Sequence, residues 1–346
     1  MSLDIRDYDY YLPEGRVALY PSEPRDASKL FYLPRLQGQP RHLQFTDFPG
    51  FLSPGDLLVL NESKVFPARL IGNKKGTGGK VEIFLLQEIA DGTWEALVRP
   101  GRRLPPGTEV DLFSGRALAR LGARTDSGGR VVKIESDGDL LSLVWQYGKV
   151  PLPPYIDREA EEEDKSHYQT IYARNVGAVA APTAGFHFTE SILARIRDAG
   201  IEMVKLTLHP GLGTFRPITR SDISQHKMHE EKFFIPKEAA DAVNLAKRES
   251  RRVVAVGTTT VRALESACCA DGQVMACGWK ETSLFISPPY DFRCINGLLT
   301  NFHLPKSTLL LLVSAFAGRE RILAAYGEAI ALGYRFYSYG DAMLIL

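Results

Sequence analysis

Histidines are concentrated in the C-terminal half of this chain, in short runs rich in glycine, proline, threonine and phenylalanine. Histidine is the side chain whose unperturbed pKa lies nearest to physiological pH, so histidines grouped in turn-rich sequence indicate proton transfer or anion binding. We therefore expect the functional site in this half. The five histidines are His187, His209, His226, His229 and His303.

Metal binding is one chemistry that these residues could support. His226 and His229 form an i, i+3 pair that Glu231 follows, but no HExxH or similar motif is present. The four cysteines lie in one stretch without the short paired spacing of structural zinc ligands. We therefore expect buried or half-buried thiols, histidines that hydrogen-bond to substrate or backbone, and no metal.

The segment Val253–Ser266 has a β-branched strand, Gly257, three threonines and then a helix that carries Arg262 and Glu265. A helix N-terminus with hydroxyls and free N–H groups favours binding of a carboxylate or phosphate. Capping of the helix by Thr258 or Thr259 is an equally simple interpretation that needs no ligand. The GxxxxGK[ST] spacing of a P-loop is absent.

Three other segments place polar side chains in loops. Residues 206–215 end a predicted strand at His209 and continue into a glycine-rich turn, where the backbone could approach a ligand closely. Residues 181–190 and 300–307 each join an aromatic ring to a histidine before a predicted helix. Those rings, Phe188 and Phe302, could stack on a base or belong to the core.

The elements that must position these loops form an α/β pattern. After the buried strand Gly55–Asn61, short strand-like pieces separated by glycine turns predict a small antiparallel barrel or sandwich. Beyond residue 151, strands and helices alternate, which predicts a mainly parallel sheet with flanking helices. We expect an α/β domain of residues 1–66 and 152–346, with residues 67–151 inserted as a β domain.

The alternating pattern makes definite element predictions. Strands are expected at 201–208 and 253–257. Helices are expected at 189–199, 237–250 and 261–270, and a long helix is expected from Ser307 past Gly318 toward Leu332.

Composition restricts the class of protein. The chain has 346 residues, 45% of them hydrophobic, and no apolar run of the roughly 20 residues that a membrane span requires. We expect a cytoplasmic protein. A net charge of +1 argues against general wrapping of nucleic acid, yet local groups of cations are candidates for phosphate contact. These cations are Lys64, Arg69, Lys74, Lys75, Lys80, Arg102 and Arg103.

Ten segments in order along the chain resemble one enzyme family. The chain is similar to the S-adenosylmethionine:tRNA ribosyltransferase-isomerases of queuosine biosynthesis over nearly its whole length. The segments are PRDAS, NESKVFPARL, GGKVEIFLL, YQTIYA, VAAPTAGFHFTE, TLHPGLGTF, HKMHEE, AVGTTTVRALES, TNFHLPKSTLLLLVSAFAGRERIL and FYSYGDAMLI. The chain departs from the family pattern at 165–167, just before YQT, and at 62–66.

The resemblance implies an α/β domain with an inserted β-barrel and a specific reaction. S-adenosylmethionine is consumed as a ribosyl donor, with no permanent cofactor and no metal. The ribosyl group is transferred and isomerised onto 7-aminomethyl-7-deazaguanine at the tRNA wobble position. Epoxyqueuosine-tRNA, adenine and methionine are the products. Neither a membrane nor an obligate protein partner is implied, and we expect a monomer.

Roles follow from residue chemistry within the matching segments. For proton transfer we expect His187, His209, His229 and His303, with Glu231 and Glu265 as orienting carboxylates. For the tRNA we expect Arg25, Lys64, Arg69, Lys74, Lys75 and Lys80. For S-adenosylmethionine and the deazaguanine we expect Thr183, Phe188, Gly211, Gly213, Thr214, Thr258, Thr259, Arg262, Glu265, Asn301, Phe302 and Lys306.

Two other functions use the same residues. A histidine-based metallohydrolase would depend on a bound metal, and a non-catalytic RNA-binding module would bind tRNA without releasing adenine.

Overall fold

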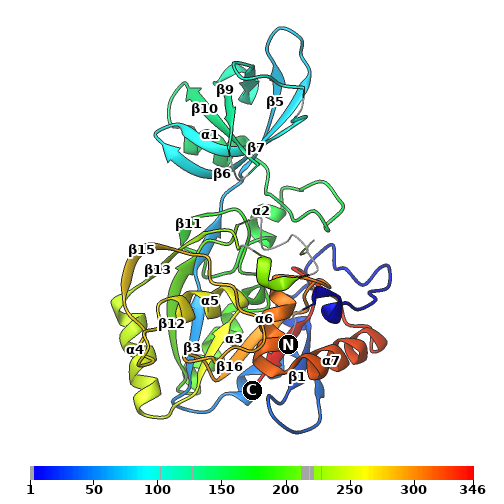
Figure 1. Ribbon diagram of the computed structural model, residues 1–346, viewed down its shortest axis with the longest axis vertical. Helices are drawn as coiled ribbons and strands as arrows, with labels where there is room; N and C mark the ends of the chain where they lie inside the picture. Colours follow the sequence, from blue (N-terminus) through cyan, green and yellow to red (C-terminus); the bar gives the residue numbers. More distant parts are fainter. Residues whose placement is uncertain (1–3, 102, 126–127, 212–217, 219–221, 227) are drawn as a thin grey trace.

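The structure is a computed structural model that describes residues 4–101, 103–125, 128–211, 218, 222–226 and 228–346. It has a large α/β body that contains both termini and a separate β-barrel joined to it by strands of the chain (Figure 1). The barrel is formed by β5 to β10, and β3 (Leu57–Asn61) and β4 (Ser63–Val65) of the body precede it in the sequence. This order agrees with an insertion into an α/β fold; the exact boundaries at 66/67 and 151/152 stay a prediction.

Within the described residues, a nine-stranded sheet forms the centre of the body. Its middle strands β12, β3, β14 and β16 pair in parallel, while both margins contain antiparallel pairs, so the sheet is mixed. In spatial order the strands are β15 (Cys277–Thr282), β13 (Glu231–Ile235), β12 (Glu202–Leu208), β3 (Leu57–Asn61), β14 (Val253–Val256), β16 (Gly297–Asn301), β17 (Ala342–Ile345), β1 (Lys29–Leu33) and β2 (Arg41–Gln44).

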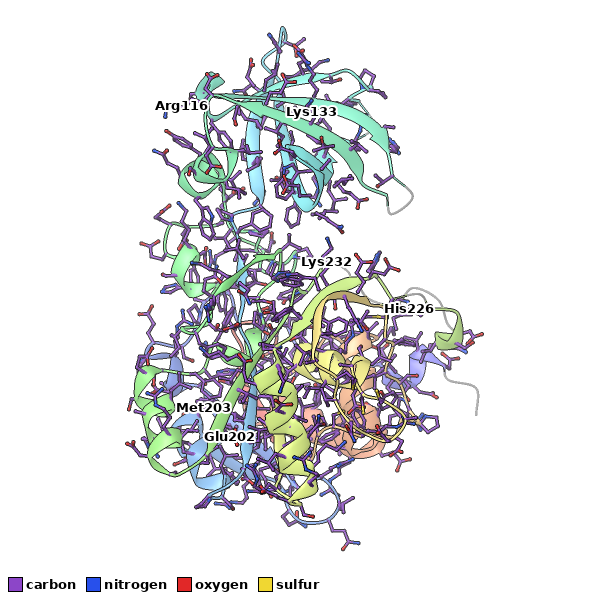
Figure 2. The ribbon with its side chains drawn as sticks, turned by 90° about the vertical axis from the view of Figure 1, so that its left-hand side faces the viewer. Arg116, Lys133, Glu202, Met203, His226 and Lys232 are labelled. Atoms are coloured by element: carbon purple, nitrogen blue, oxygen red, sulfur yellow. The ribbon has the colours of Figure 1, made fainter. Side chains whose placement is uncertain are left out.

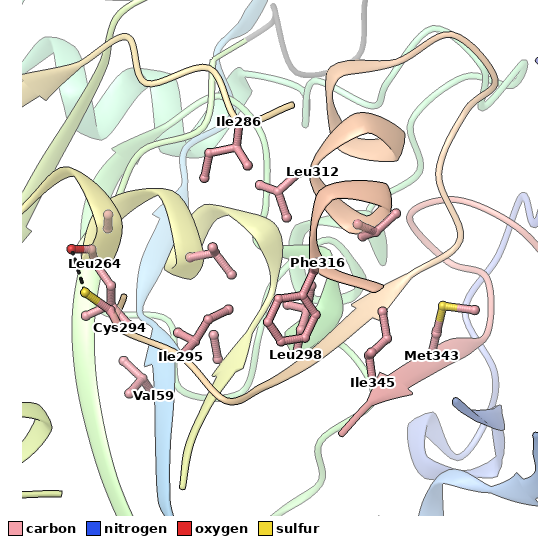
Figure 3. Close-up of a cluster of buried hydrophobic side chains, with 14 of the residues drawn as sticks. Val59, Leu264, Ile286, Cys294, Ile295, Leu298, Leu312, Phe316, Met343 and Ile345 are labelled. Carbon is pink, nitrogen blue, oxygen red and sulfur yellow. Dashed lines mark hydrogen bonds between the residues drawn. The ribbon is translucent and has the colours of Figure 1, made fainter. Parts of the chain in front are cut away.

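The central strands are apolar on both faces because helices cover both. β3, β14 and β16 are buried at every position. On one face α4 (Lys237–Arg248), α5 (Thr258–Ser266), α6 (Thr308–Ala317) and α7 (Arg319–Ala331) share a core with Val59 and Leu298. Figure 3 shows part of this core, including Leu264, Leu312 and Phe316. On the other face α3 (Glu190–Asp198) and the 3-10 helix Phe45–Phe51 share a core with Leu58 and Leu60.

The barrel has a core of its own. Its strands close in the order β10, β7, β6, β5, β8, β9, all antiparallel. Alternate residues of each strand point inward, as in Lys80–Ala90 where Val81, Ile83 and Leu85 are buried. The bounds are β5 (Arg69–Lys74), β6 (Lys80–Ala90), β7 (Thr93–Arg99), β8 (Glu109–Leu112), β9 (Ala117–Arg124) and β10 (Arg130–Ser136), with α1 (Leu140–Tyr147) packed beside them.

Two predicted helix boundaries are corrected by the structure. The helix expected at 261–270 begins at Thr258, because Gly257 with φ of +89° is its N-cap. The long helix expected from Ser307 is two helices, since Gly318 with φ of +90° ends α6 and precedes α7. Among the described residues, no helix combines the length and apolar character that crossing a membrane would require.

Candidate functional site

A cavity with about 600 Å³ of empty space, including space open to solvent, lies where the parallel strands β14 and β16 end. Crevices at the carboxyl ends of such strands are where open α/β sheets bind ligands. Six of the expected residues line it, which are Thr183, Thr258, Thr259, Asn301, Phe302 and His303. We call this space the cavity.

The first turn of α5 faces the cavity through Thr258 and Thr259. The N-cap is Gly257, and no side chain forms a capping hydrogen bond there. Thr259 Oγ1 accepts from Asn61, and Thr260 Oγ1 donates to the carbonyl of Val256. The interpretation of Thr258 or Thr259 as a helix cap is therefore wrong. The uncapped N-terminus carries partial positive charge at the cavity wall.

Asn301, at the end of β16, connects the cavity to a buried histidine. Its Oδ1 accepts from Thr183 Oγ1 at 3.1 Å, and its Nδ2 donates to Nε2 of His187 at 3.2 Å. Because Nε2 accepts, Nδ1 of His187 holds the proton and donates to Ser28 Oγ at 2.7 Å. Burial lowers the pKa of His187 to about 3, with further contributions from Arg335 and Arg25. His187 is therefore a neutral ring that orients Asn301.

His303 lines the cavity as a second neutral histidine. Its Nε2 hydrogen-bonds to Thr300 Oγ1 at 2.9 Å, its backbone N–H donates to the Tyr326 hydroxyl at 3.0 Å, and Tyr10 donates to its carbonyl. Burial lowers the pKa of His303 to about 3. A neutral imidazole held in this way contributes hydrogen bonds rather than charge.

His209 follows β12 and has a defined tautomer. Ser63 Oγ donates to the carbonyl of Leu208 at 2.6 Å, so it accepts from His209 Nδ1 at 3.2 Å. Nε2 is consequently the unprotonated nitrogen, and it lies against Gly177, where an added Cβ would come within 2.6 Å of it. The pKa of His209 is lowered to about 4, mainly by burial and to a lesser extent by the positive charge of the nearby Lys232.

Sequence reasoning missed Tyr155 and Ser338, which line the cavity, and Asn61, which lies beside it. The hydroxyls of Tyr155 and Ser338 hydrogen-bond at 2.6 Å. Asn61 joins three elements, since its Nδ2 donates to the carbonyl of Leu208 at 2.8 Å and to Thr259 Oγ1 at 3.1 Å. Ser338 and Asn61 lie in segments that resemble the family, and this resemblance was the signal that could have identified them. Serine and asparagine do not by themselves suggest a catalytic role.

Arg262 and Glu231 are bound to each other rather than exposed to a substrate. Arg262 Nη1 donates to Glu231 Oε2, both side chains are buried, and Arg262 Nε donates to the carbonyl of Leu284 at 3.0 Å. Glu231 Oε1 also accepts from the backbone N–H of Gly211 at 2.9 Å. This pair holds the loop after β12 against α5. The expected contact of Arg262 with a substrate carboxylate is replaced by this internal ion pair.

Several other expected residues do not reach the cavity. Glu265 accepts from the backbone of Arg293 and Cys294 and from the Tyr290 hydroxyl. Lys306 forms an ion pair with Asp9 at 2.6 Å. These groups are structural anchors, so the roles expected for them at the substrate are not supported by the geometry.

The two expected stacking rings are both buried, but only Phe302 reaches the cavity. Phe188 is fully buried, with Phe45, Phe48 and Tyr172 around it. Phe302 lines the cavity, but its ring packs in a cluster of aromatic side chains: Phe31, Tyr326, Tyr334 and Phe336. The core interpretation therefore applies to Phe188.

His229 is exposed and does not line the cavity. Gly213, Thr214 and Arg102 lie outside the described residues. Within the part of the chain that is described, no group of three histidine, cysteine or acidic side chains could hold a metal ion. Of the cysteines, Cys294 is buried, Cys268 and Cys277 are half-buried, and Cys269 is exposed.

A cleft with about 1910 Å³ of empty space separates the barrel from the body. Figure 2 shows Lys232 on the side of the body that faces the barrel, while Glu202 at the start of β12 lies on the far side. The parallel strands therefore end toward the barrel. His209 and Gly211 line the cleft, and Pro210 lines both the cleft and the cavity. The two spaces are neighbours.

The expected tRNA-binding cations differ in how they are paired. Arg25 is turned inward and donates to the carbonyls of Gln169 and Ser166. Arg69 pairs with Glu82 at 2.7 Å, and Lys75 pairs with Glu109 at 3.3 Å.

Three further cations complete the set. Lys64 lies over the ring of Trp145, 5.2 Å from its centroid. Lys74 and Lys80 form no ion pair with another described residue, and they flank the turn between β5 and β6. Lys80 is exposed and Arg103 is also exposed. Lys74 and Lys80 are therefore the best placed to meet phosphates.

Comparison with known proteins identifies the family of the chain. The family model described as queuosine biosynthesis protein matches residues 5–345. The S-adenosylmethionine:tRNA ribosyltransferase-isomerase of Heliobacterium modesticaldum is 52% identical over 99% of this chain and 100% of its own length. The enzyme of that name from Thermus thermophilus is 53% identical over 98% of both chains.

A solved structure shows the same likeness. The crystal structure of S-adenosylmethionine tRNA ribosyltransferase from Thermotoga maritima has 36% identity and a TM-score of 0.57, and the match covers 98% of this chain and 100% of that one. The fold, the segments around the cavity and the identity over the whole length lead to one conclusion. This chain belongs to the S-adenosylmethionine:tRNA ribosyltransferase-isomerase family of queuosine biosynthesis.

Proposed function

We propose that this enzyme transfers and isomerises the ribosyl group of S-adenosylmethionine onto 7-aminomethyl-7-deazaguanine at the wobble position of tRNA. The products are epoxyqueuosine-tRNA, adenine and methionine. The observation that carries the proposal is the uncapped N-terminus of α5, which meets the cavity beside Asn301 and His303. The co-substrate is consumed, and the reaction uses no permanent cofactor.

The methionine carboxylate of S-adenosylmethionine binds at the start of α5. A carboxylate there meets the partial positive charge of the helix and the hydroxyl of Thr258. Arg262, which sequence reasoning assigned to this role, is neutralised by Glu231, so the helix terminus supplies the attraction. Asn301 and Thr183, fixed by their mutual hydrogen bond, contact the nucleoside part.

His209 accepts the proton that begins the rearrangement. The sulfonium acidifies the ribose 5′ carbon, so a neutral base near it can remove a proton. Nε2 of His209 is the unprotonated nitrogen, and the low pKa of the ring keeps it so at neutral pH. Its position beside Pro210, between cavity and cleft, suits a base that acts where the two substrates meet.

His187 and His303 orient the substrate rather than transfer protons. Both ring nitrogens of His187 are hydrogen-bonded, to Ser28 and to Asn301, and Nε2 of His303 is hydrogen-bonded to Thr300. His187 acts through Asn301, and His303 presents its ring at the cavity. Adenine leaves from the cavity after hydrogen bonds with Asn301, His303 and Thr183 have oriented it.

The tRNA reaches the reacting ribosyl group through the cleft. Lys74 and Lys80 contact its phosphates, and the wobble base passes between barrel and body. We expect the enzyme to act as a monomer in the cytoplasm, where tRNA is available as substrate.

One incubation tests this function against its two alternatives. The protein is mixed with S-adenosylmethionine and tRNA that carries 7-aminomethyl-7-deazaguanine, and adenine and the modified nucleoside are quantified. We expect both products in equal amounts, with or without a chelator. tRNA with guanine at the wobble position is the control and yields neither. Binding without adenine release indicates an RNA-binding module, and loss of activity with a chelator indicates a metal-dependent enzyme.

A further inference from the structure

The strand β13, at the sheet margin next to the cleft, is fully buried on one face and partly exposed on the other. On β13, Phe233 and Ile235 are buried in the same core as α4, whereas Lys232 and Phe234 alternate toward the other face. Trp279 on the neighbouring strand β15 contacts Phe234, with ring centroids 5.7 Å apart. Trp279 is 53% exposed. A large aromatic ring thus stands open on the side of the body that lines the cleft.

Trp279 is held in a definite orientation. The imidazole of His209 stacks on it with centroids 5.0 Å apart and an interplanar angle of 25°. His209 is in turn fixed by Ser63 and by its packing against Gly177. A ring held by His209 and Phe234, with about half of its surface exposed, is a preformed stacking surface, which costs little conformational entropy to use.

The stacking surface lies next to the reaction site. His209 and Trp279 line the cleft, and Pro210, the residue after His209, also lines the cavity. The opposite wall of the cleft comes from the barrel, including Leu86, Gln87 and Trp94. A nucleotide chain whose reacting base enters the cavity therefore has its neighbouring nucleotide within the cleft.

The charges of the cleft indicate which part of a nucleotide would meet Trp279. Its lining contains two lysines and four glutamates, which are Lys232, Lys280, Glu88, Glu230, Glu231 and Glu281. Because acidic side chains outnumber basic ones in this lining, it does not favour binding of phosphates. A nucleobase, which has a π face and no charge, is the part of a nucleotide that suits this wall.

We propose that Trp279 stacks on an unpaired base of the tRNA that neighbours the modified nucleotide. The inference rests on the proposed function for the identity of the RNA. Stacking of this kind tolerates any base, so it contributes affinity rather than sequence recognition. The contribution of stacking to tRNA affinity depends weakly on salt concentration, whereas the contribution of the barrel lysines depends on it strongly.

Fluorescence quenching tests the contact directly, since a base stacked on an indole quenches its emission. The probe is an unmodified tRNA transcript with guanine at the wobble position, titrated without S-adenosylmethionine. Of the three tryptophans, Trp94 is 6% exposed and Trp145 is half-buried, so Trp279 is the most accessible. We expect quenching in wild type, most of which disappears in Trp279→Phe.

Affinity distinguishes stacking from a fluorescence artefact. By filter binding, Trp279→Ala is expected to weaken the tRNA complex on the order of tenfold, while Trp279→Phe stays within about threefold because a phenyl ring still stacks. The matched control is Tyr11→Ala, which removes another exposed ring, 82% exposed and outside both spaces. Trp279→Ala binding with wild-type affinity, in a protein with an unchanged melting temperature, overturns the proposal.

The binding assay is independent of turnover. If wild type releases adenine but Trp279→Ala binds tRNA normally, the stacking contact fails and the proposed function stands. If wild type releases no adenine but the alanine variant loses affinity, the proposed function fails and the stacking contact stands.

Discussion

Asn301 donates a hydrogen bond to Nε2 of His187 at 3.2 Å, although the two residues are 114 positions apart in the chain. The same amide accepts from Thr183 at the cavity, and His187 donates to Ser28. A single series of hydrogen bonds therefore runs from a buried serine to two cavity-lining groups. Ser28 is a positioning residue whose effect reaches the substrate through His187 and Asn301.

Removal of the Ser28 hydroxyl is expected to impair substrate binding. In Ser28→Ala, Nδ1 of His187 loses its acceptor, and the ring no longer holds the Asn301 amide in one orientation. The KM for S-adenosylmethionine should rise about tenfold, which corresponds to one hydrogen bond of roughly 1–1.5 kcal/mol. The affinity for tRNA should not change.

Thr189→Ala is the matched control for that variant. Thr189 is the N-cap of α3, in the same loop as His187, and it contacts Asp26 rather than the cavity. Its removal should lower the free energy of unfolding by about 1 kcal/mol without changing the KM. An unchanged KM in Ser28→Ala, measured by steady-state kinetics, would show that the hydrogen-bond series is only structural.

Stability is expected to fall as the solution is acidified below pH 6.5. The folded pKa values of His187 and His303 are about 3, below the unfolded value of 6.5. The unfolded chain therefore binds more protons between these limits, and each histidine lowers the free energy of unfolding by about 1.4 kcal/mol per pH unit. No such decrease occurs above pH 7.

Urea unfolding at pH 7.0, 5.5 and 4.5 measures this effect. The variant His187→Gln, which cannot take up a proton there, should show a shallower decline than wild type. The same pH dependence in both proteins would mean that His187 is not held neutral by the fold.

The start of α5 is predicted to recognise a carboxylate. Thr258→Val should raise the KM for S-adenosylmethionine about tenfold or more, because the hydrogen bond that it removes involves a charged group. With decarboxylated S-adenosylmethionine, wild type and the variant should have equal KM values. Thr260→Val is the control, since that hydroxyl is buried and donates to the carbonyl of Val256 at the end of β14. A penalty that persists with the decarboxylated substrate would place the carboxylate elsewhere.

The barrel lysines are predicted to contribute electrostatic affinity for tRNA. Lys74→Gln with Lys80→Gln should weaken binding and reduce the slope of log affinity against log salt by up to about 0.9 for each phosphate that is no longer neutralised. Lys149→Gln with Lys165→Gln removes two cations that are already paired with glutamates, and should change the slope little. Equal slopes in all three proteins would move the tRNA surface away from the barrel hairpin.

The fold was largely predictable because local patterns agree with it. The apolar run Leu57–Asn61 is a central strand, and Thr189 and Ser307 cap their helices as their residue types suggest. The break at Gly318 was missed, because the apolar pattern continues on both sides while the backbone at the glycine leaves the helical region.

The site was less predictable, since its geometry depends on partners distant in sequence. Glu231 and Arg262, 31 residues apart, neutralise each other, and nothing local in the sequence reveals the pairing. Ser28 and His187 are 159 residues apart. A short motif could indicate that His187 and Asn301 matter, but not that burial makes the histidine a neutral orienting group.

The central claim is that S-adenosylmethionine gives its ribosyl group, and not its methyl group, to tRNA. The most direct measurement uses S-adenosylmethionine with carbon-14 in the ribose and tritium in the methyl group, incubated with tRNA that carries 7-aminomethyl-7-deazaguanine. We expect carbon-14 in the tRNA, no tritium there, and one adenine released for each ribosyl group transferred. Tritium in the tRNA, or adenine release without transfer of carbon-14, would contradict the claim.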